Sequence, residues 1–105
     1  MAPFVVAKIG EISPGRTKLI QIGKRLISIF HTNGTYYALD EMCPHRAGPL
    51  SEGKVLGATV TCPWHGATFD LKTGKSLSVP TLRSAKCYEV RVVGEEIVVL
   101  VTTDA

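Results

Sequence analysis

The sequence has little cysteine, no long apolar run and no cluster of like charges, and each shortage excludes a class of protein. Three cysteines among 105 residues are too few for a small disulfide-stabilised domain. No apolar stretch approaches the roughly 20 residues that span a bilayer, and the N-terminus lacks the pattern of a signal peptide. A net charge of +3 is scattered along the chain. We therefore expect a cytoplasmic protein that binds neither membrane nor nucleic acid.

Helical periodicity is also missing, and runs rich in Val, Ile, Thr and aromatic residues predict strands instead. Turn residues separate these runs, and Asn33-Gly34 is a strong hairpin signal. The predicted strands cover residues 5–12, 19–22, 26–31, 35–39, 55–62 and 67–71, with two more across 86–101. We predict an all-β fold in which residues 1–105 form a single domain, a small antiparallel β-sandwich or partial barrel.

Residues 40–69, approximately, differ from the rest in being rich in glycine and proline. Loops of this composition are commonly held in fixed shapes and carry functional groups on a rigid framework. We expect this stretch to be an inserted subdomain that presents two metal-bearing loops.

Two clusters of metal-binding residue types lie in this stretch, Cys43 with His45 and Cys62 with His65, in the pattern C-x-H-x16-C-x2-H. Two cysteines and two histidines suit a 2Fe–2S centre in which one iron takes both thiolates and the other both imidazoles. Zinc also takes two of each, although usually from closely spaced pairs of one residue type. The spacing favours the iron centre and leaves zinc open.

The wider sequence around the clusters resembles the Rieske family, in particular the small ferredoxins of bacterial ring-hydroxylating dioxygenases. The similarity is carried by CPHRAGPL at residues 43–50 and CPWHGATFD at 62–70, with EGKV at 52–55, Thr73-Gly74 and Pro80. This resemblance implies one 2Fe–2S cluster, with Cys43 and Cys62 on the inner iron. It places His45 and His65 on the outer iron, near the tip of the protein.

The sequence departs from the respiratory and photosynthetic members of that family at four positions. Gly48 and Trp64 stand where those proteins have a disulfide, and Ala67 and Phe69 replace a serine and a tyrosine whose hydroxyls bond toward sulfur. Fewer hydrogen bonds to the sulfurs leave the reduced, more negative cluster less stabilised. We expect a midpoint potential at the low end of the Rieske range of about −150 to +300 mV.

The function that follows is electron transfer without catalysis. His31 is the only other histidine, so the chain lacks a two-histidine, one-carboxylate iron site, and it has no glycine-rich nucleotide fingerprint. The resemblance implies a monomeric one-electron carrier between a flavin-dependent NAD(P)H reductase and a terminal oxygenase. The alternatives are a Rieske-type small subunit of a nitrite reductase or another multicomponent redox enzyme, and a zinc-stabilised interaction module.

Other notable side chains have structural interpretations that compete with functional ones. We expect Trp64 to pack beneath the cluster loops and shield the sulfurs. Arg46 is as well explained by a solvated loop charge as by partner docking. The remaining expectations are a strand-end or capping role for Asp40 and Glu41, an exposed position for His31, and a half-buried, redox-inactive Cys87 in a strand.

Overall fold

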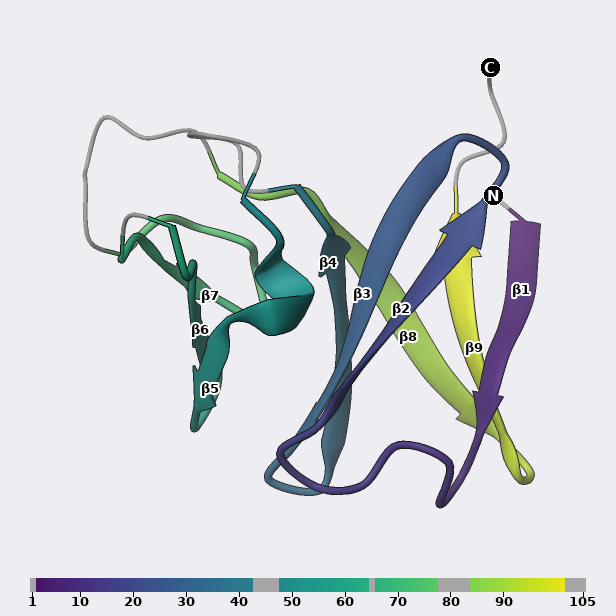
Figure 1. The fold of residues 1–105 in the computed structure, drawn as a ribbon. Helices are drawn as coiled ribbons and strands as arrows, with labels where there is room; N and C mark the ends of the chain where they lie inside the picture. Colours follow the sequence, from purple (N-terminus) through teal and green to yellow (C-terminus); the bar gives the residue numbers. More distant parts are fainter. Residues whose placement is uncertain (1, 43–47, 65, 78–83, 102–105) are drawn as a thin grey trace.

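The computed structural model describes residues 2–42, 48–64, 66–77 and 84–101 and folds them into two antiparallel sheets of unequal size. Figure 1 shows the smaller sheet beside the larger one, with a short 3-10 helix, η1 (Leu50–Glu52), between them. The strands are Ala2–Lys8 (β1), Thr17–Ile22 (β2), Arg25–Thr32 (β3), Thr35–Asp40 (β4), Lys54–Leu56 (β5), Thr59–Thr61 (β6), Thr68–Asp70 (β7), Cys87–Val93 (β8) and Glu96–Val101 (β9). The predicted all-β fold is confirmed.

The larger sheet has six strands in the order β1-β9-β8-β4-β3-β2 and curls into a partial barrel. The hairpin predicted at Asn33-Gly34 joins β3 to β4, and Thr32 pairs with Thr35 across it. Strands β1 and β2 are the two edges. The ammonium group of Lys18 in β2 donates to the carbonyl of Val6 in β1 at 2.8 Å, so a side chain links the edges where no backbone ladder does.

The smaller sheet, in the order β5-β6-β7, corrects one predicted element. Residues 55–62 were expected to form one strand, but they contain the turn of a hairpin between β5 and β6, with Val55 opposite Val60. Gly57 occupies the turn at φ 60°, a conformation that costs glycine little because it has no Cβ. The apolar alternation on both sides of Gly57 concealed this turn.

Two apolar cores share the strands β3 and β4. Ile27, Ile29 and Ala38 point into the barrel, whereas Phe30 and Leu39 point toward the smaller sheet. Strand β3 is consequently buried on both faces from Ile27 to Phe30. The barrel core is completed by Ala7, Ile12, Tyr88, Ile97, Val99 and Val101, and the core between the sheets by Leu50, Val60, Cys62, Ala67, Phe69, Leu71 and Ala85.

The chain leaves the barrel after β4 and returns to it at β8, which lies next to β4 in the sheet. At this point the amide of Asp40 donates to the carbonyl of Lys86 at 2.9 Å. The described residues between Asp40 and Lys86, which include η1 and the smaller sheet, therefore project from one place on the barrel, and we call them the lobe. Within the part of the chain that the structure describes, no helix is long and apolar enough to cross a membrane.

Candidate metal centre

Of the four predicted ligands, the structure describes Cys62, while Cys43, His45 and His65 lie outside the described residues. Arg46 and Pro80 also lie outside them. Among the described residues, no group of three or more His, Cys, Asp or Glu side chains is placed to hold a metal ion. The described part of the candidate centre consists of Cys62 and the residues that flank the two predicted loops.

Cys62 follows β6 at the start of the second predicted loop, and only 1% of it is exposed. Its amide donates to the carbonyl of Ala67 at 2.7 Å, and its carbonyl accepts from the amide of Gly66 at 3.0 Å. Gly66 has φ 71°, which allows the chain to reverse there. These bonds hold Cys62 close to Gly66 and Ala67 and so fix the described backbone before and after position 65.

The base of the first loop is equally well defined. Met42 and Pro49 form an isolated antiparallel bridge, and the amide of Leu50 donates to the carbonyl of Glu41 at 2.8 Å. Met42 and Pro49, the described residues on either side of the first loop, are therefore held next to each other. Fixing the points from which a loop starts and ends lowers the entropy cost of bringing groups on it together.

A buried carboxylate strengthens this base. One oxygen of Glu41 accepts from Ser28 Oγ at 2.5 Å and from the amide of Ser51 at 2.7 Å, and the other accepts from Ser51 Oγ at 2.6 Å. Only 6% of Glu41 is exposed. Hydrogen bonds to an ionised acceptor are stronger than neutral ones, so Glu41 joins the barrel, the first loop and η1. This agrees with the expected structural role of Glu41 and adds the partners that the sequence did not identify.

The two loops meet at Gly48. A Cβ atom built on Gly48 would lie 2.7 Å from Cys62 Sγ and 3.2 Å from Cγ of Trp64. The first separation is shorter than real Cβ atoms show and the second is unusually tight, so a larger residue at position 48 would have to displace the Cys62 sulfur. The end of the loop that carries Cys43 and His45 therefore touches the sulfur of Cys62. A buried thiol at the junction of two closed loops, each with a further predicted Cys or His, fits the donor set of a Rieske cluster.

Two positions that the sequence analysis singled out share the apolar core with Cys62. Ala67 and Phe69 are buried in the core between the sheets, and neither carries a hydroxyl group. Neither described cysteine is in a disulfide. The environment of Cys62 is consistent with the low potential predicted from the sequence, which stays a prediction.

Three expectations for single residues are wrong. Trp64 is 58% exposed instead of packed beneath the loops: its side chain lies beside Gly48, and most of it faces solvent. His31 is half-buried: its Nδ1 lies 2.7 Å from the carbonyl of Ile12, and its ring stacks on Tyr36 at 4.2 Å. Cys87 is exposed instead of half-buried, although it does lie in a strand, at the start of β8; its redox inactivity stays a prediction.

A second polar network, which the sequence did not reveal, lies where the loops join the barrel. The hydroxyl of Tyr88 donates to Asp40 and accepts from Arg25 Nη1, the latter at 2.9 Å. Burial raises the pKa of Tyr88 to about 12, and the hydrogen bond to Asp40 adds to the rise. Long-range pairs of this kind have no local sequence signal.

Comparison with known proteins identifies the family that the geometry suggests. The Rieske [2Fe-2S] domain matches residues 2–89. The chain belongs to the Rieske [2Fe-2S] domain family. A solved Rieske structure, the ferredoxin of carbazole 1,9a-dioxygenase from Nocardioides aromaticivorans IC177, aligns with a TM-score of 0.87 and 26% identity, covering 94% of this chain and 97% of that one.

Ferredoxins of dioxygenase systems recur among the Rieske relatives. The 3-phenylpropionate/cinnamic acid dioxygenase ferredoxin subunit of Photorhabdus laumondii is 33% identical over 105 residues, 99% of each protein. Human apoptosis-inducing factor 3 is 30% identical over 95% of this chain, but the chain spans only 16% of that relative's length. The predicted family and cofactor are confirmed, and the ferredoxin names agree with an electron carrier that is not itself an enzyme.

Proposed function

We propose that this protein is a one-electron carrier that a flavin-dependent NAD(P)H reductase reduces and a terminal oxygenase component reoxidises. The observation that carries the proposal is the full-length match to a dioxygenase ferredoxin subunit, 33% identical over 99% of both proteins. A solved complex of reduced oxygenase and oxidized ferredoxin in carbazole 1,9a-dioxygenase adds support, with a TM-score of 0.86 and 28% identity. We further propose that the carrier is a cytoplasmic monomer.

The proposed ligands are Cys43 and Cys62 for one iron and His45 and His65 for the other. When bound, a cluster of this type accepts and releases one electron. The protein itself holds the ligands and excludes water. The hydrogen bonds of Cys62 to Gly66 and Ala67 orient its backbone, and Gly48 lies against its sulfur. The Glu41 carboxylate binds Ser51 and so secures the base from which the first loop starts.

An electron carrier fits this chain better than a Rieske oxygenase. A mononuclear iron site of the oxygenase kind takes two histidines and a carboxylate. The chain has three histidines, of which His45 and His65 are assigned to the cluster. His31 contacts the carbonyl of Ile12 and stacks on Tyr36, and so it is already engaged. Nitrite reductase small subunits share the fold at 20% and 22% identity, which supports the fold alone.

The proposal is tested first on the purified protein. We expect about two iron atoms and two acid-labile sulfides per chain, and after dithionite a paramagnetic signal of mixed nitrogen and sulfur ligation. Cys62→Ser should abolish the cluster, whereas Cys87→Ser, which changes an exposed cysteine, should retain it. A colourless protein that contains zinc would overturn the proposal.

The second test is reconstitution of electron flow. We expect NAD(P)H-driven hydroxylation by reductase and oxygenase to require this protein, and Cys62→Ser to abolish it. An oxygenase that turns over equally well without the protein would contradict the carrier role even if the cluster is present.

A further inference from the structure

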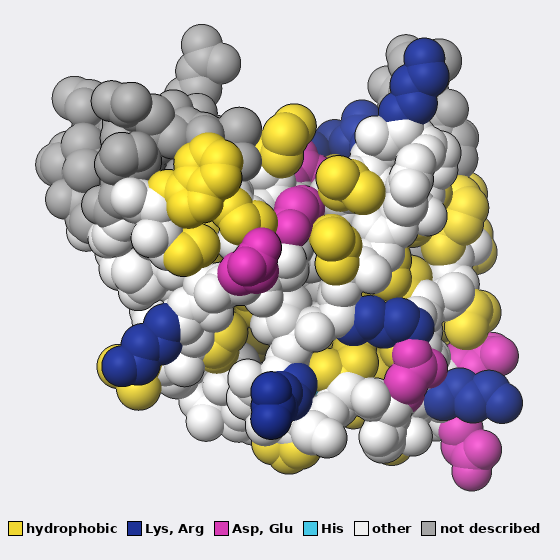
Figure 2. All heavy atoms as spheres, viewed as in Figure 1, with side chains coloured by type: hydrophobic (Ala, Val, Ile, Leu, Met, Phe, Trp, Pro, Cys, Tyr) yellow, Lys and Arg dark blue, Asp and Glu magenta, His cyan; other side chains and the backbone are white. Residues whose placement is uncertain are grey.

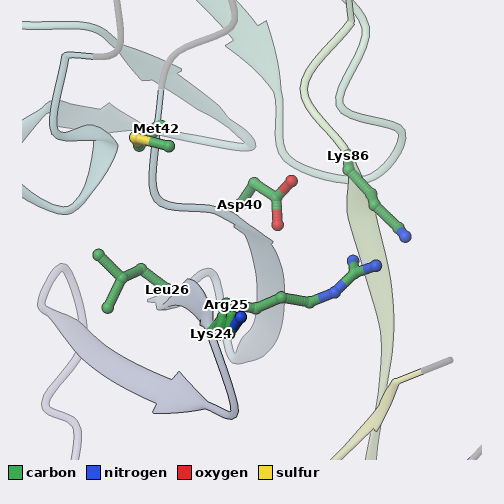
Figure 3. Close-up of a pocket in the computed structure, with 6 residues that line it drawn as sticks. All are labelled: Lys24, Arg25, Leu26, Asp40, Met42 and Lys86. Carbon is green, nitrogen blue, oxygen red and sulfur yellow. The ribbon is translucent and has the colours of Figure 1, made fainter. Parts of the chain in front are cut away.

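A hollow of about 440 Å³ lies where the projecting lobe joins the barrel. Its lining comes from three places in the sequence, namely the start of β3, the end of β4 with the residue before the first loop, and the residue before β8. Figure 3 shows these side chains, which are Lys24, Arg25, Leu26, Asp40, Met42 and Lys86. No step proposed above uses this hollow.

The charged wall of the hollow is basic. Lys24, Arg25 and Lys86 contribute three positive charges, against one carboxylate, Asp40. Asp40 accepts a hydrogen bond from the Tyr88 hydroxyl, which also accepts from Arg25. Lys86 Nζ lies 5.5 Å from the centre of the Tyr88 ring, and both lysines are exposed. The hollow therefore presents an excess of positive charge to solvent.

The opposite wall is apolar and leads to the candidate metal centre. Leu26 is 40% and Met42 59% exposed, and Figure 3 shows both on the side away from Arg25 and Lys86. Met42 pairs with Pro49, and the neighbouring Gly48 approaches the exposed Trp64. Figure 2 shows apolar side chains, with acidic ones among them, gathered between the two sheets, and basic ones over the turn between β2 and β3.

We infer that this hollow binds an acidic protein segment that carries an apolar side chain, and that the segment belongs to a redox partner of the proposed carrier. Carboxylates complement Lys24 and Lys86, and an apolar side chain covers Leu26 and Met42. Asp40 and the apolar wall disfavour a nucleic-acid backbone, whose phosphates Asp40 repels and whose sugars and phosphates supply no apolar side chain for Leu26 and Met42. Met42 directly precedes Cys43, so a segment bound in the hollow would lie beside the first loop. The identification of that segment with a redox partner rests on the proposed function.

The binding test uses the intact protein and a red-dye-labelled peptide, Gly-Glu-Glu-Leu-Glu-Glu-Gly, followed by fluorescence anisotropy at low salt. The variant Lys24→Glu/Lys86→Glu should bind about tenfold more weakly than the parent protein, because each reversal turns an attraction into a repulsion. Met42→Gln should weaken binding about threefold by removing apolar contact. The matched control is Lys8→Glu/Lys54→Glu, which changes the net charge equally at exposed lysines outside the hollow and should change binding less than twofold.

Each outcome of the titration decides the inference. Equal binding by both double variants overturns it, as does equal affinity for the same peptide with lysine in place of glutamate. Tighter binding of a single-stranded oligonucleotide of the same charge would instead assign the hollow to nucleic acid. The titration measures peptide binding and not electron flow. A protein that lacks a cluster would therefore refute the proposed function, while its peptide binding would still test the inference about the hollow.

The physiological readout is the reconstituted electron-transfer assay. We expect Lys24→Glu/Lys86→Glu to lower the second-order rate constant with one partner about tenfold, and raised salt to shrink the difference, because the Debye length is about 10 Å at 0.1 M. The control pair should show less than a twofold change. Equal rates for the two double variants with both partners would overturn the assignment to a redox partner while the carrier function stands.

Discussion

Replacement of Glu41 by alanine tests how the first loop is held. The Glu41 carboxylate accepts three hydrogen bonds, from Ser28 Oγ, the Ser51 amide and Ser51 Oγ, at 2.5 to 2.7 Å. Ser28 is completely buried, so water cannot replace its lost partner, whereas Ser51 is half-buried. A buried donor without a partner costs about 1–3 kcal/mol. We expect Glu41→Ala to lower the free energy of unfolding by about 3 kcal/mol in total.

This loss is large for a domain whose total stability is about 5–15 kcal/mol. For about 100 residues it corresponds to a fall in Tm of roughly 10–20 °C. The assay is thermal unfolding by circular dichroism, with all variants at one scan rate, together with the rate at which the visible absorbance bleaches. Bleaching should be faster in Glu41→Ala because the two ends of residues 43–48 separate more readily.

The matched control is Glu52→Ala, which removes an exposed carboxylate one residue after Ser51 and should shift Tm by less than about 3 °C. A double-mutant cycle adds a second check. Once Glu41 is alanine, Ser51→Ala should cost clearly less than it does alone, because the two residues share the same hydrogen bonds. The reasoning is refuted if Glu41→Ala and Glu52→Ala shift Tm equally, or if the effects of Glu41→Ala and Ser51→Ala are additive.

Three further predictions follow from the site and its surroundings. Gly48→Ala should reduce the iron content of the purified protein, because the new Cβ would lie 2.7 Å from Cys62 Sγ. Adding Trp64→Ala to this variant should not restore the iron content. If it does, the clash is with the indole of Trp64 and not with the Cys62 sulfur. Ala67→Ser should raise the midpoint potential by roughly 40 mV in a redox titration, the equivalent of one hydrogen bond of about 1 kcal/mol, whereas an unchanged potential would show that the hydroxyl does not reach sulfur. Because the pKa of Tyr88 is raised to about 12 from an ordinary 10, its contribution to stability should be complete below pH 10 and lost as pH rises toward 12; Tyr88→Phe should flatten stability in that interval, and an unchanged slope would count against it.

The all-β fold was predictable because local signals dominate it. Alternating apolar residues and the Asn33-Gly34 turn set the register of β3 and β4, and the structure shows both. The hairpin at Gly57 was missed because a glycine inside an apolar alternation is also compatible with one continuous strand. The sequence thus predicted the strands better than the turns between them.

The candidate centre was predictable in its chemistry and less so in its surroundings. The spacing of Cys43, His45, Cys62 and His65 is a local pattern, and it led to the family that the comparison confirms. Trp64 lies beside Gly48 and not beneath the loops, and the role of Glu41 depends on Ser28. Such contacts arise only when separate segments are brought together, so no single-sequence pattern reports them. The assignment of all four ligands stays a prediction.

The hydrogen bond between the Asp40 amide and the Lys86 carbonyl means that the lobe could be removed or exchanged as a unit. Since its entrance and exit are neighbours in one sheet, a short connector between β4 and β8 would replace the whole excursion without breaking the order of the six strands. The excised version would need polar substitutes at Phe30 and Leu39, which the lobe now covers. Conversely, lobes taken from other Rieske proteins are natural candidates for transplantation onto this barrel.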